Sequence, residues 1–106
     1  MISRPSFFLQ FFIFALDKPN AGALRAAHRK AQIAFQESRP DLFITRGTII
    51  ADDGATEIGS LMLLDVPDLT AAQAFWKEDP LLRAGLFDRV EFYRWRFGRV
   101  FTAASD

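Results

Sequence analysis

The sequence has no cysteine and only one histidine among its 106 residues. The missing cysteines exclude a disulfide framework, a thiolate nucleophile and a cysteine metal cluster, and one histidine cannot build a multi-histidine metal site. The chain also lacks a phosphate-binding loop, a zinc-ligand spacing, a Ser-His-Asp signature and a nucleophile elbow. We therefore predict no metal site and no cofactor.

The chain also lacks an excess of charge of either sign. It carries 13 basic and 13 acidic side chains, so its formal net charge is zero. A neutral chain has no broad positive field to attract a polyphosphate backbone or an anionic membrane surface. Nucleic acid and membranes are therefore not expected as partners.

Long hydrophobic runs are absent as well. The longest run covers residues 7–16 and is interrupted by Gln10, whereas a helix that crosses a bilayer needs about 20 apolar residues. Arg4 precedes this run and small residues follow at 21–23, as in a secretory signal peptide, but the polar segment 17–19 intervenes. We expect instead a cytoplasmic protein whose first strand is this run.

What is present is the composition of one globular domain, which we assign to residues 1–106. Half of the residues are apolar, and the length suits a single hydrophobic core. Twelve phenylalanines accompany a single tyrosine. The aromatic side chains therefore fill volume but bring almost no hydroxyl groups for hydrogen bonding.

The first half of the chain predicts a strand followed by a helix. Residues 7–16 are aromatic and branched and favour a strand, and helix formers follow from Ala21 to about Gln36, with Asn20 as the candidate N-cap. At the helical period of about 100° per residue, one stripe of this helix is predicted to face inward. The stripe contains Leu24, Ala27, His28, Ala31, Ala34 and Phe35. The only histidine is therefore expected to point inward.

The second half predicts further short helices between strands. Thr70 and Gln73 have the spacing of a capping box that starts a helix over residues 70–77. The pair Asp79-Pro80 suits the cap and first position of a further helical turn, which Gly85 ends.

Three more strands complete the predicted fold. Residues 42–50 and 58–66 form a hairpin around the Asp53-Gly54 turn signal, and residues 88–98 form the last strand. The order strand, helix, strand, strand, helix, strand is that of the ferredoxin-like βαββαβ fold, an α+β fold. With right-handed crossovers, the first and third strands lie in the middle of an antiparallel sheet and the helices cover one face.

Such a sheet has one bare face, yet its first strand is apolar on both faces. One face carries Phe7, Leu9, Phe11, Ile13 and Ala15, and the other carries Phe8, Phe12, Phe14 and Leu16. A monomer rarely exposes an apolar patch of that size. We therefore expect a homodimer in which a second copy covers the open sheet face.

His28 is the first candidate for catalysis, because imidazole exchanges protons near neutral pH. A core histidine held by one hydrogen bond is the alternative. Arg25 lies one helical turn earlier, where it could contact an anionic substrate or a carboxylate, or could be an ordinary exposed arginine.

Four carboxylates, Asp41, Asp52, Asp53 and Asp79, are candidates for orienting the imidazole, a role that needs hydrogen-bond reach to a ring nitrogen. A solvated hairpin turn is the alternative for Asp52 and Asp53, and a helix cap is the alternative for Asp79.

Ligand contacts are expected from two strands. Ser60 follows Gly59, so a small hydroxyl beside a bare backbone leaves room for a ligand. Trp95 and Tyr93 could line a pocket, with core or interface packing as the alternative.

Several short motifs together resemble the YciI-like (YCII-related) domain family. They are Arg25-x-x-His28, Gly47, the Asp-Gly turn, Gly59-Ser60, Asp79-Pro80, Gly85-Leu86-Phe87 and Trp95. The resemblance extends from about Phe8 to Phe101. It implies a dimeric α/β barrel related in fold to muconolactone isomerase. Most members of the family have no established reaction.

Where activity is known in that family, the resemblance implies dehydrochlorination or related lyase chemistry on a hydroxylated chlorinated ring, with a histidine and an aspartate as the catalytic pair. His28 matches the histidine, and Asp79 and Ser60 match the Asp-Pro and Gly-Ser positions. The family's aspartate follows the histidine within about a dozen residues, whereas the corresponding segment here is two residues longer. Glu37 or Asp41 would substitute, or neither.

Two functions follow as hypotheses. The first is a small-molecule enzyme with lyase, dehydrochlorinase-like or isomerase chemistry, in which His28 is the general base, Asp79 or Asp41 orients it, and Ser60 and Arg25 contact the ligand. The second is a non-catalytic ligand-binding or structural homodimer. Haem or oxygen chemistry, as in other dimeric α/β barrels, is a third alternative.

Overall fold

The computed structural model describes residues 9–101. Its elements are β1 (Leu9–Asp17), α1 (Gly22–Ala27), α2 (Arg29–Glu37), β2 (Phe43–Ile50), β3 (Glu57–Val66), α3 (Leu69–Trp76), α4 (Pro80–Arg83) and β4 (Phe87–Trp95). The predicted order of strands and helical segments is confirmed. Phe7 and Phe8, predicted to open the first strand, lie outside the described residues.

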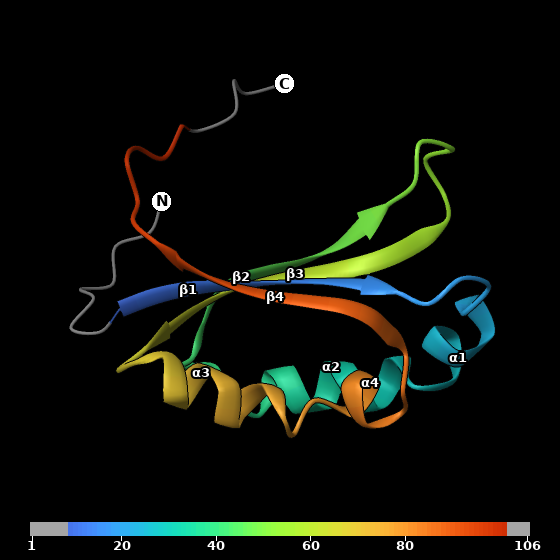
Figure 1. Ribbon diagram of the computed structural model, residues 1–106, viewed down its shortest axis with the longest axis horizontal. Helices are drawn as coiled ribbons and strands as arrows, with labels where there is room; N and C mark the ends of the chain where they lie inside the picture. The colour runs from blue at the N-terminus through green and yellow to red at the C-terminus, as the bar shows by residue number, and fades with distance from the viewer. Residues whose placement is uncertain (1–8, 102–106) are drawn as a thin grey trace.

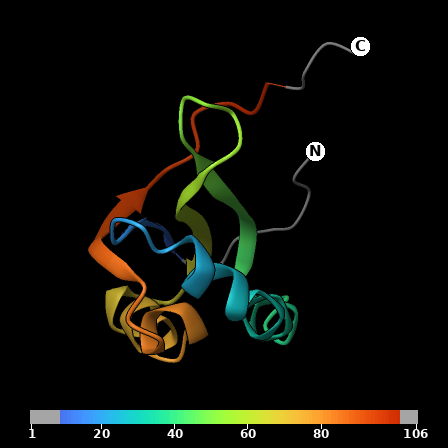
Figure 2. The same cartoon turned by 90° about the vertical axis from the view of Figure 1, so that its right-hand side faces the viewer.

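The four strands form one sheet in the order β2-β3-β1-β4, and all neighbouring strands are antiparallel. The prediction that the first and third strands are central is therefore confirmed. The helices lie on one face of the sheet, with α2 beside the α3 and α4 unit (Figures 1 and 2). This is the predicted α+β arrangement, and no helix of residues 9–101 lies on the opposite face.

The hydrophobic core lies between the sheet and the helices. On β1 it contains Phe11, Ile13 and Ala15, which alternate with side chains on the opposite face. Phe75 of α3 stacks on Phe35 of α2 with ring centroids 5.1 Å apart. Burial of each large apolar side chain contributes roughly 2–3 kcal/mol, so this layer supplies the main driving force for folding.

The open face of the sheet also carries aromatic side chains. The ring of Phe12 lies 5.2 Å from that of Tyr93 and 5.8 Å from that of Trp95, measured between centroids. Tyr93 is 47% exposed, Trp95 39% and Leu61 38%. Phenylalanines therefore pack on both sides of β1, as the alternating pattern predicts.

The first helical segment differs from its prediction. The backbone leaves helical geometry at His28 (φ −106°, ψ 8°), so two helices, α1 and α2, replace the single helix predicted from Ala21 to Gln36.

The predicted inward stripe of this segment is only partly right, because Phe35 packs against the core whereas the alanines of the stripe do not. Ala27, Ala31 and Ala34 are exposed, while the buried residues are Arg25, Gln32 and Gln36. The periodicity argument assumes that the covered face is apolar. Here that face covers a polar pocket, so polar side chains point inward.

Two helix caps were also mispredicted. Asp68, not Thr70, caps α3, and its carboxylate accepts a hydrogen bond from Ala71 N at 2.8 Å. Ala21, not Asn20, precedes α1, and Asn20 adopts a left-handed conformation (φ 58°) that asparagine tolerates in turns. Nearby carboxylates and turn geometry thus displaced the expected caps.

The remaining turn predictions are confirmed. Asp79 caps α4, and Pro80 occupies the first turn of that helix. Gly85 has φ 78°, a left-handed conformation that favours glycine, where the chain turns into β4. The hairpin turn carries Asp53, whose side chain accepts hydrogen bonds from Ala55 N and Thr56 N.

Candidate ligand-binding site

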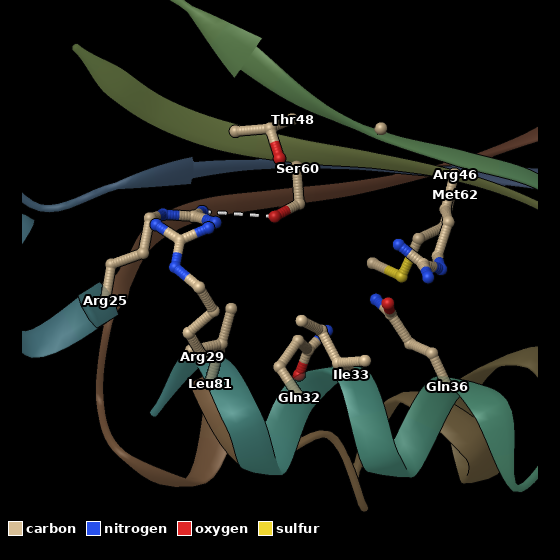
Figure 3. Close-up of a pocket in the computed structure, with 11 residues that line it drawn as sticks. Arg25, Arg29, Gln32, Ile33, Gln36, Arg46, Thr48, Ser60, Met62 and Leu81 are labelled. Carbon is tan, nitrogen blue, oxygen red and sulfur yellow. Dashed lines mark hydrogen bonds between the residues drawn. The ribbon is translucent and has the colours of Figure 1, made fainter. Parts of the chain in front are cut away.

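A small pocket of about 120 Å³ lies on the helix-covered side of β2 and β3, against α2 (Figure 3). Its lining is mainly polar. The helices α1 and α2 supply Arg25, Arg29, Gln32, Ile33 and Gln36, and the strands supply Arg46, Thr48, Ser60 and Met62. Leu81 of α4 also lines it.

The strand register brings the polar strand residues together. Thr48 pairs with Ser60 and Arg46 pairs with Met62 across β2 and β3, and cross-strand partners project from the same face. Met62 is buried in the core beneath the helices, so this face is the helix-covered one. At Gly59 a Cβ would lie 2.5 Å from the carbonyl oxygen of Ala15, so only glycine lets β3 approach β1 this closely.

Arg25 is the most constrained charge of the pocket. Its Nε and Nη2 each lie 2.7 Å from a different carboxylate oxygen of Asp17, and Nη2 also donates to Ser60 Oγ at 3.1 Å. Only 7% of the Arg25 side chain and 5% of the Asp17 side chain are exposed. A buried charge needs such partners, since its desolvation is otherwise unfavourable.

Asp79 lies behind the pocket and fixes the side chain of Gln32, which lines it. Gln32 Nε2 donates to the Asp79 carboxylate at 2.9 Å, and Leu81 N and Leu82 N donate to its other oxygen at 2.8 and 3.2 Å. Burial raises the pKa of Asp79, while these hydrogen bonds and the charge of Arg25 oppose that rise. The Gln32 Oε1 is buried and has no hydrogen-bond partner within residues 9–101.

The other two arginines of the pocket differ from Arg25. Arg29 forms an exposed ion pair with Glu57, and this hydrogen bond lowers the pKa of Glu57. Arg46 extends from the exposed edge strand β2 and has no acidic partner in the described part of the chain.

The structure brings three of the predicted site residues together. Arg25 and Ser60 both line the pocket and are hydrogen-bonded to each other. Asp79 does not line it but contacts it through Gln32.

The other three predicted residues lie elsewhere. His28 is half-buried at the junction of α1 and α2 and does not line the pocket. Asp41 is exposed in the loop before β2. Trp95 lies at the end of β4, and its ring contacts Phe12 on the open face of the sheet.

Sequence reasoning missed Gln32, Arg46 and Thr48. Gln32 is one helical turn after His28, so a histidine turned inward should have drawn attention to it. Arg46 and Thr48 are two residues apart in a strand, which places both on one face. Two polar side chains on one face of a strand that begins and ends with apolar residues were the available signal.

Two kinds of feature are absent from the described residues. Between residues 9 and 101 there is no cluster of three or more histidine, cysteine or acidic side chains that could hold a metal ion. No helix in the same range is long and apolar enough to cross a membrane. The arrangement is suited to binding a small polar molecule through arginine, amide and hydroxyl groups.

Together, the fold and the pocket define a small α+β domain with a polar pocket between its sheet and its helices. Residues 9–96 match the model of the YCII-related domain. The chain therefore belongs to the YCII-related domain family, and the resemblance of the sequence motifs is confirmed. None of the curated proteins that were compared with the chain matches it.

Solved structures support the same fold. The chain is similar to the 5-chloro-2-hydroxyhydroquinone dehydrochlorinase TftG from Burkholderia phenoliruptrix, solved with 2,5-dihydroxybenzoquinone, with a TM-score of 0.80, 24% identity, and coverage of 84% of this chain and 95% of that one. It is also similar to SnoaB, a cofactor-independent oxygenase from Streptomyces nogalater, with a TM-score of 0.55, 13% identity, and coverage of 87% and 95%. At these identities the likeness establishes the fold alone.

Proposed function

We propose that this protein is a small-molecule enzyme with lyase, dehydrochlorinase-like or isomerase chemistry, and that its substrate binds in the pocket between α2 and the β2–β3 strands. The observation that carries the proposal is the buried contact between Arg25 and Ser60, which lines a small pocket together with further polar side chains. Family membership and the likeness to a dehydrochlorinase support it.

His28 is the proposed general base, because imidazole is the side chain that ordinarily exchanges protons near neutral pH. It lies outside the pocket lining. The role therefore requires a substrate that extends past Gln32 toward the junction of α1 and α2. Asp79 acts in this proposal as a positioning residue, because its oxygens are occupied by Gln32 and by the first turn of α4. Asp41 remains the other candidate partner of the imidazole.

The test is turnover of 5-chloro-2-hydroxyhydroquinone. Turnover is measured as the release of chloride and as the absorbance of the quinone product. His28→Ala should lower kcat by at least about 100-fold, in line with the loss of a general base. Lys30→Ala, an exposed change on α2, is the matched control and should leave kcat unchanged. Full turnover by His28→Ala would refute the assigned base, and no turnover by the wild type would exclude this substrate.

The second candidate function is a non-catalytic ligand-binding or structural domain. The position of His28 outside the pocket favours it. Ligand binding without turnover of any hydroxylated ring compound, combined with unchanged binding in His28→Ala, would support this alternative over the enzyme.

We also propose that two copies associate through the open sheet face. Leu61, Tyr93 and Trp95 are exposed there, on strands whose other face packs against the helices. A contiguous apolar surface of this kind favours association, because burial of apolar area lowers the free energy. The two-fold pairing of identical faces would give a closed dimer.

A further inference from the structure

We propose that the pocket selects a small hydroxylated carboxylate, with Arg46 as the residue that recognises the negative charge. This inference deepens the proposed function. It rests on one part of the proposed function, namely that the ligand binds in this pocket.

One of the three arginines that line the pocket has no counter-charge among the described residues. Arg25 is neutralised by Asp17 and Arg29 by Glu57. Arg46 lines the same pocket and has no acidic partner among the described residues. Counted over the lining arginines and their ion-pair partners, and leaving aside Asp79 behind Gln32, one positive charge therefore remains. A monoanionic ligand would balance that charge.

The position of Arg46 suits a carboxylate. It lies with Gln36 and Met62 at one end of the pocket, while Arg25 and Ser60 lie at the other (Figure 3). A guanidinium group presents two parallel N–H donors that match the two oxygens of a carboxylate. A ligand could thus place its charged group at one end and reach the hydroxyl of Ser60 at the other.

Gln32 favours a ligand that also carries a hydroxyl group. It is 7% exposed and lines the pocket, and its Oε1 is a buried acceptor without a partner in residues 9–101. Asp79 accepts from Nε2 at 2.9 Å, which fixes the amide with its oxygen free. A buried acceptor left unpaired is unfavourable, because it has given up its hydrogen bonds to water without replacing them. A ligand hydroxyl would supply the missing hydrogen bond by donating to Oε1.

The size and walls of the pocket limit the part of the ligand that lies inside it to about one ring. Its volume is about 120 Å³, slightly less than a cavity of about 150 Å³ that holds one benzene molecule. Ile33, Met62 and Leu81 give it apolar walls between the polar ends. The ligand class is therefore a small hydroxylated ring or chain that carries one carboxylate.

The experiment measures binding by isothermal titration calorimetry. The probes are benzoate, its three monohydroxy isomers, and benzamide as the neutral analogue of similar shape, all at one ionic strength. The variants are Arg46→Gln, Gln32→Leu and Lys30→Gln. The last of these is the matched loss of one exposed positive charge outside the pocket lining. Circular dichroism confirms that each variant is folded.

We expect benzoate to bind the wild type at least about tenfold more tightly than benzamide, which corresponds to the strength of a hydrogen bond to a charged group. Arg46→Gln should remove that difference, and Lys30→Gln should keep it. One hydroxybenzoate should bind at least about fivefold more tightly than benzoate, and Gln32→Leu should abolish this gain.

Several outcomes would overturn the inference. These are equal affinity for benzoate and benzamide, equal losses in the two charge variants, and no saturable binding of any carboxylate up to about 10 mM. The proposed function fails separately. Turnover of a neutral quinol without carboxylate binding would refute only the carboxylate inference, whereas carboxylate binding without turnover of any ring compound would refute only catalysis.

Discussion

Arg25 and Asp17 form a two-point ion pair that joins helix α1 to the end of β1. Both contacts measure 2.7 Å, and both side chains are almost completely buried. The same guanidinium reaches Ser60 on β3. Arg25 therefore stabilises the fold and at the same time places a hydrogen-bond donor in the pocket.

Removal of one partner of this pair should be strongly destabilising. We expect Arg25→Ala to lower the free energy of unfolding by about 3 kcal/mol or more, because Asp17 is left as a buried, unpaired charge. Urea unfolding followed by circular dichroism measures the change. Arg29→Ala is the control: it removes an exposed pair with Glu57 and should cost less than about 1 kcal/mol.

A double variant isolates the pairing itself. Arg25→Ala combined with Asp17→Ala should cost clearly less than the sum of the two single changes, because no unpaired charge remains. Simple additivity would show that the two side chains do not stabilise each other.

Asp79 should make stability depend on pH. Burial raises its pKa in the folded protein, so the folded chain holds this proton to a higher pH than the unfolded chain, and the contribution of Asp79 to stability falls as the pH rises through that window. Asp79→Asn removes the titration. We expect the stability of this variant relative to the wild type to increase as the pH rises above about 4, the usual pKa of an aspartate in an unfolded chain, as measured by urea unfolding.

Asp53 provides a control of opposite sign. Hydrogen bonds from the Thr56 hydroxyl and from the backbone N–H groups of Thr56 and Ala55 lower its pKa to about 2. Its contribution to stability is present above the unfolded pKa and is lost as the pH falls through the folded value. Asp53→Asn should therefore lose stability relative to the wild type as the pH rises. The same trend in both variants would contradict the assignment to Asp79.

Association through the open sheet face can be tested with one charge. We expect the wild type to elute as a dimer in size-exclusion chromatography with light scattering, and Leu61→Glu, on β3, to elute as a monomer because its carboxylate would be buried in the interface. Leu69→Glu changes a similarly exposed leucine in α3 and should leave the dimer intact. A monomeric wild type would refute the proposed dimer.

Much of the fold follows from local sequence signals. The alternation of Phe11 and Ile13 with Phe12 identifies β1, and the Asp53-Gly54 turn identifies the hairpin. Asp79 before Pro80 predicts the start of α4 correctly. These signals depend on interactions between residues that are close in the sequence. The folded structure therefore contains the strand, the turn and the helix start that they predict.

The pocket was only partly predictable. Arg25 and Ser60 were selected from the sequence, but Gln32 and Arg46 were not. The helical periodicity placed alanines rather than Gln32 on the inner face, and Arg46 lies on a strand whose pairing the sequence does not specify. Their grouping depends on the register of β2 with β3 and on the break of the helix at His28, and neither has a strong local signal.

The sequence by itself determined the order of the elements, the central position of β1 and β3, and the absence of cysteine chemistry. Only the tertiary structure decided which polar side chains share one pocket and that His28 lies beside it rather than in it. The physical reason is that periodicity reports how apolar a face is, whereas a binding site forms where separate elements bring buried polar groups within hydrogen-bonding distance.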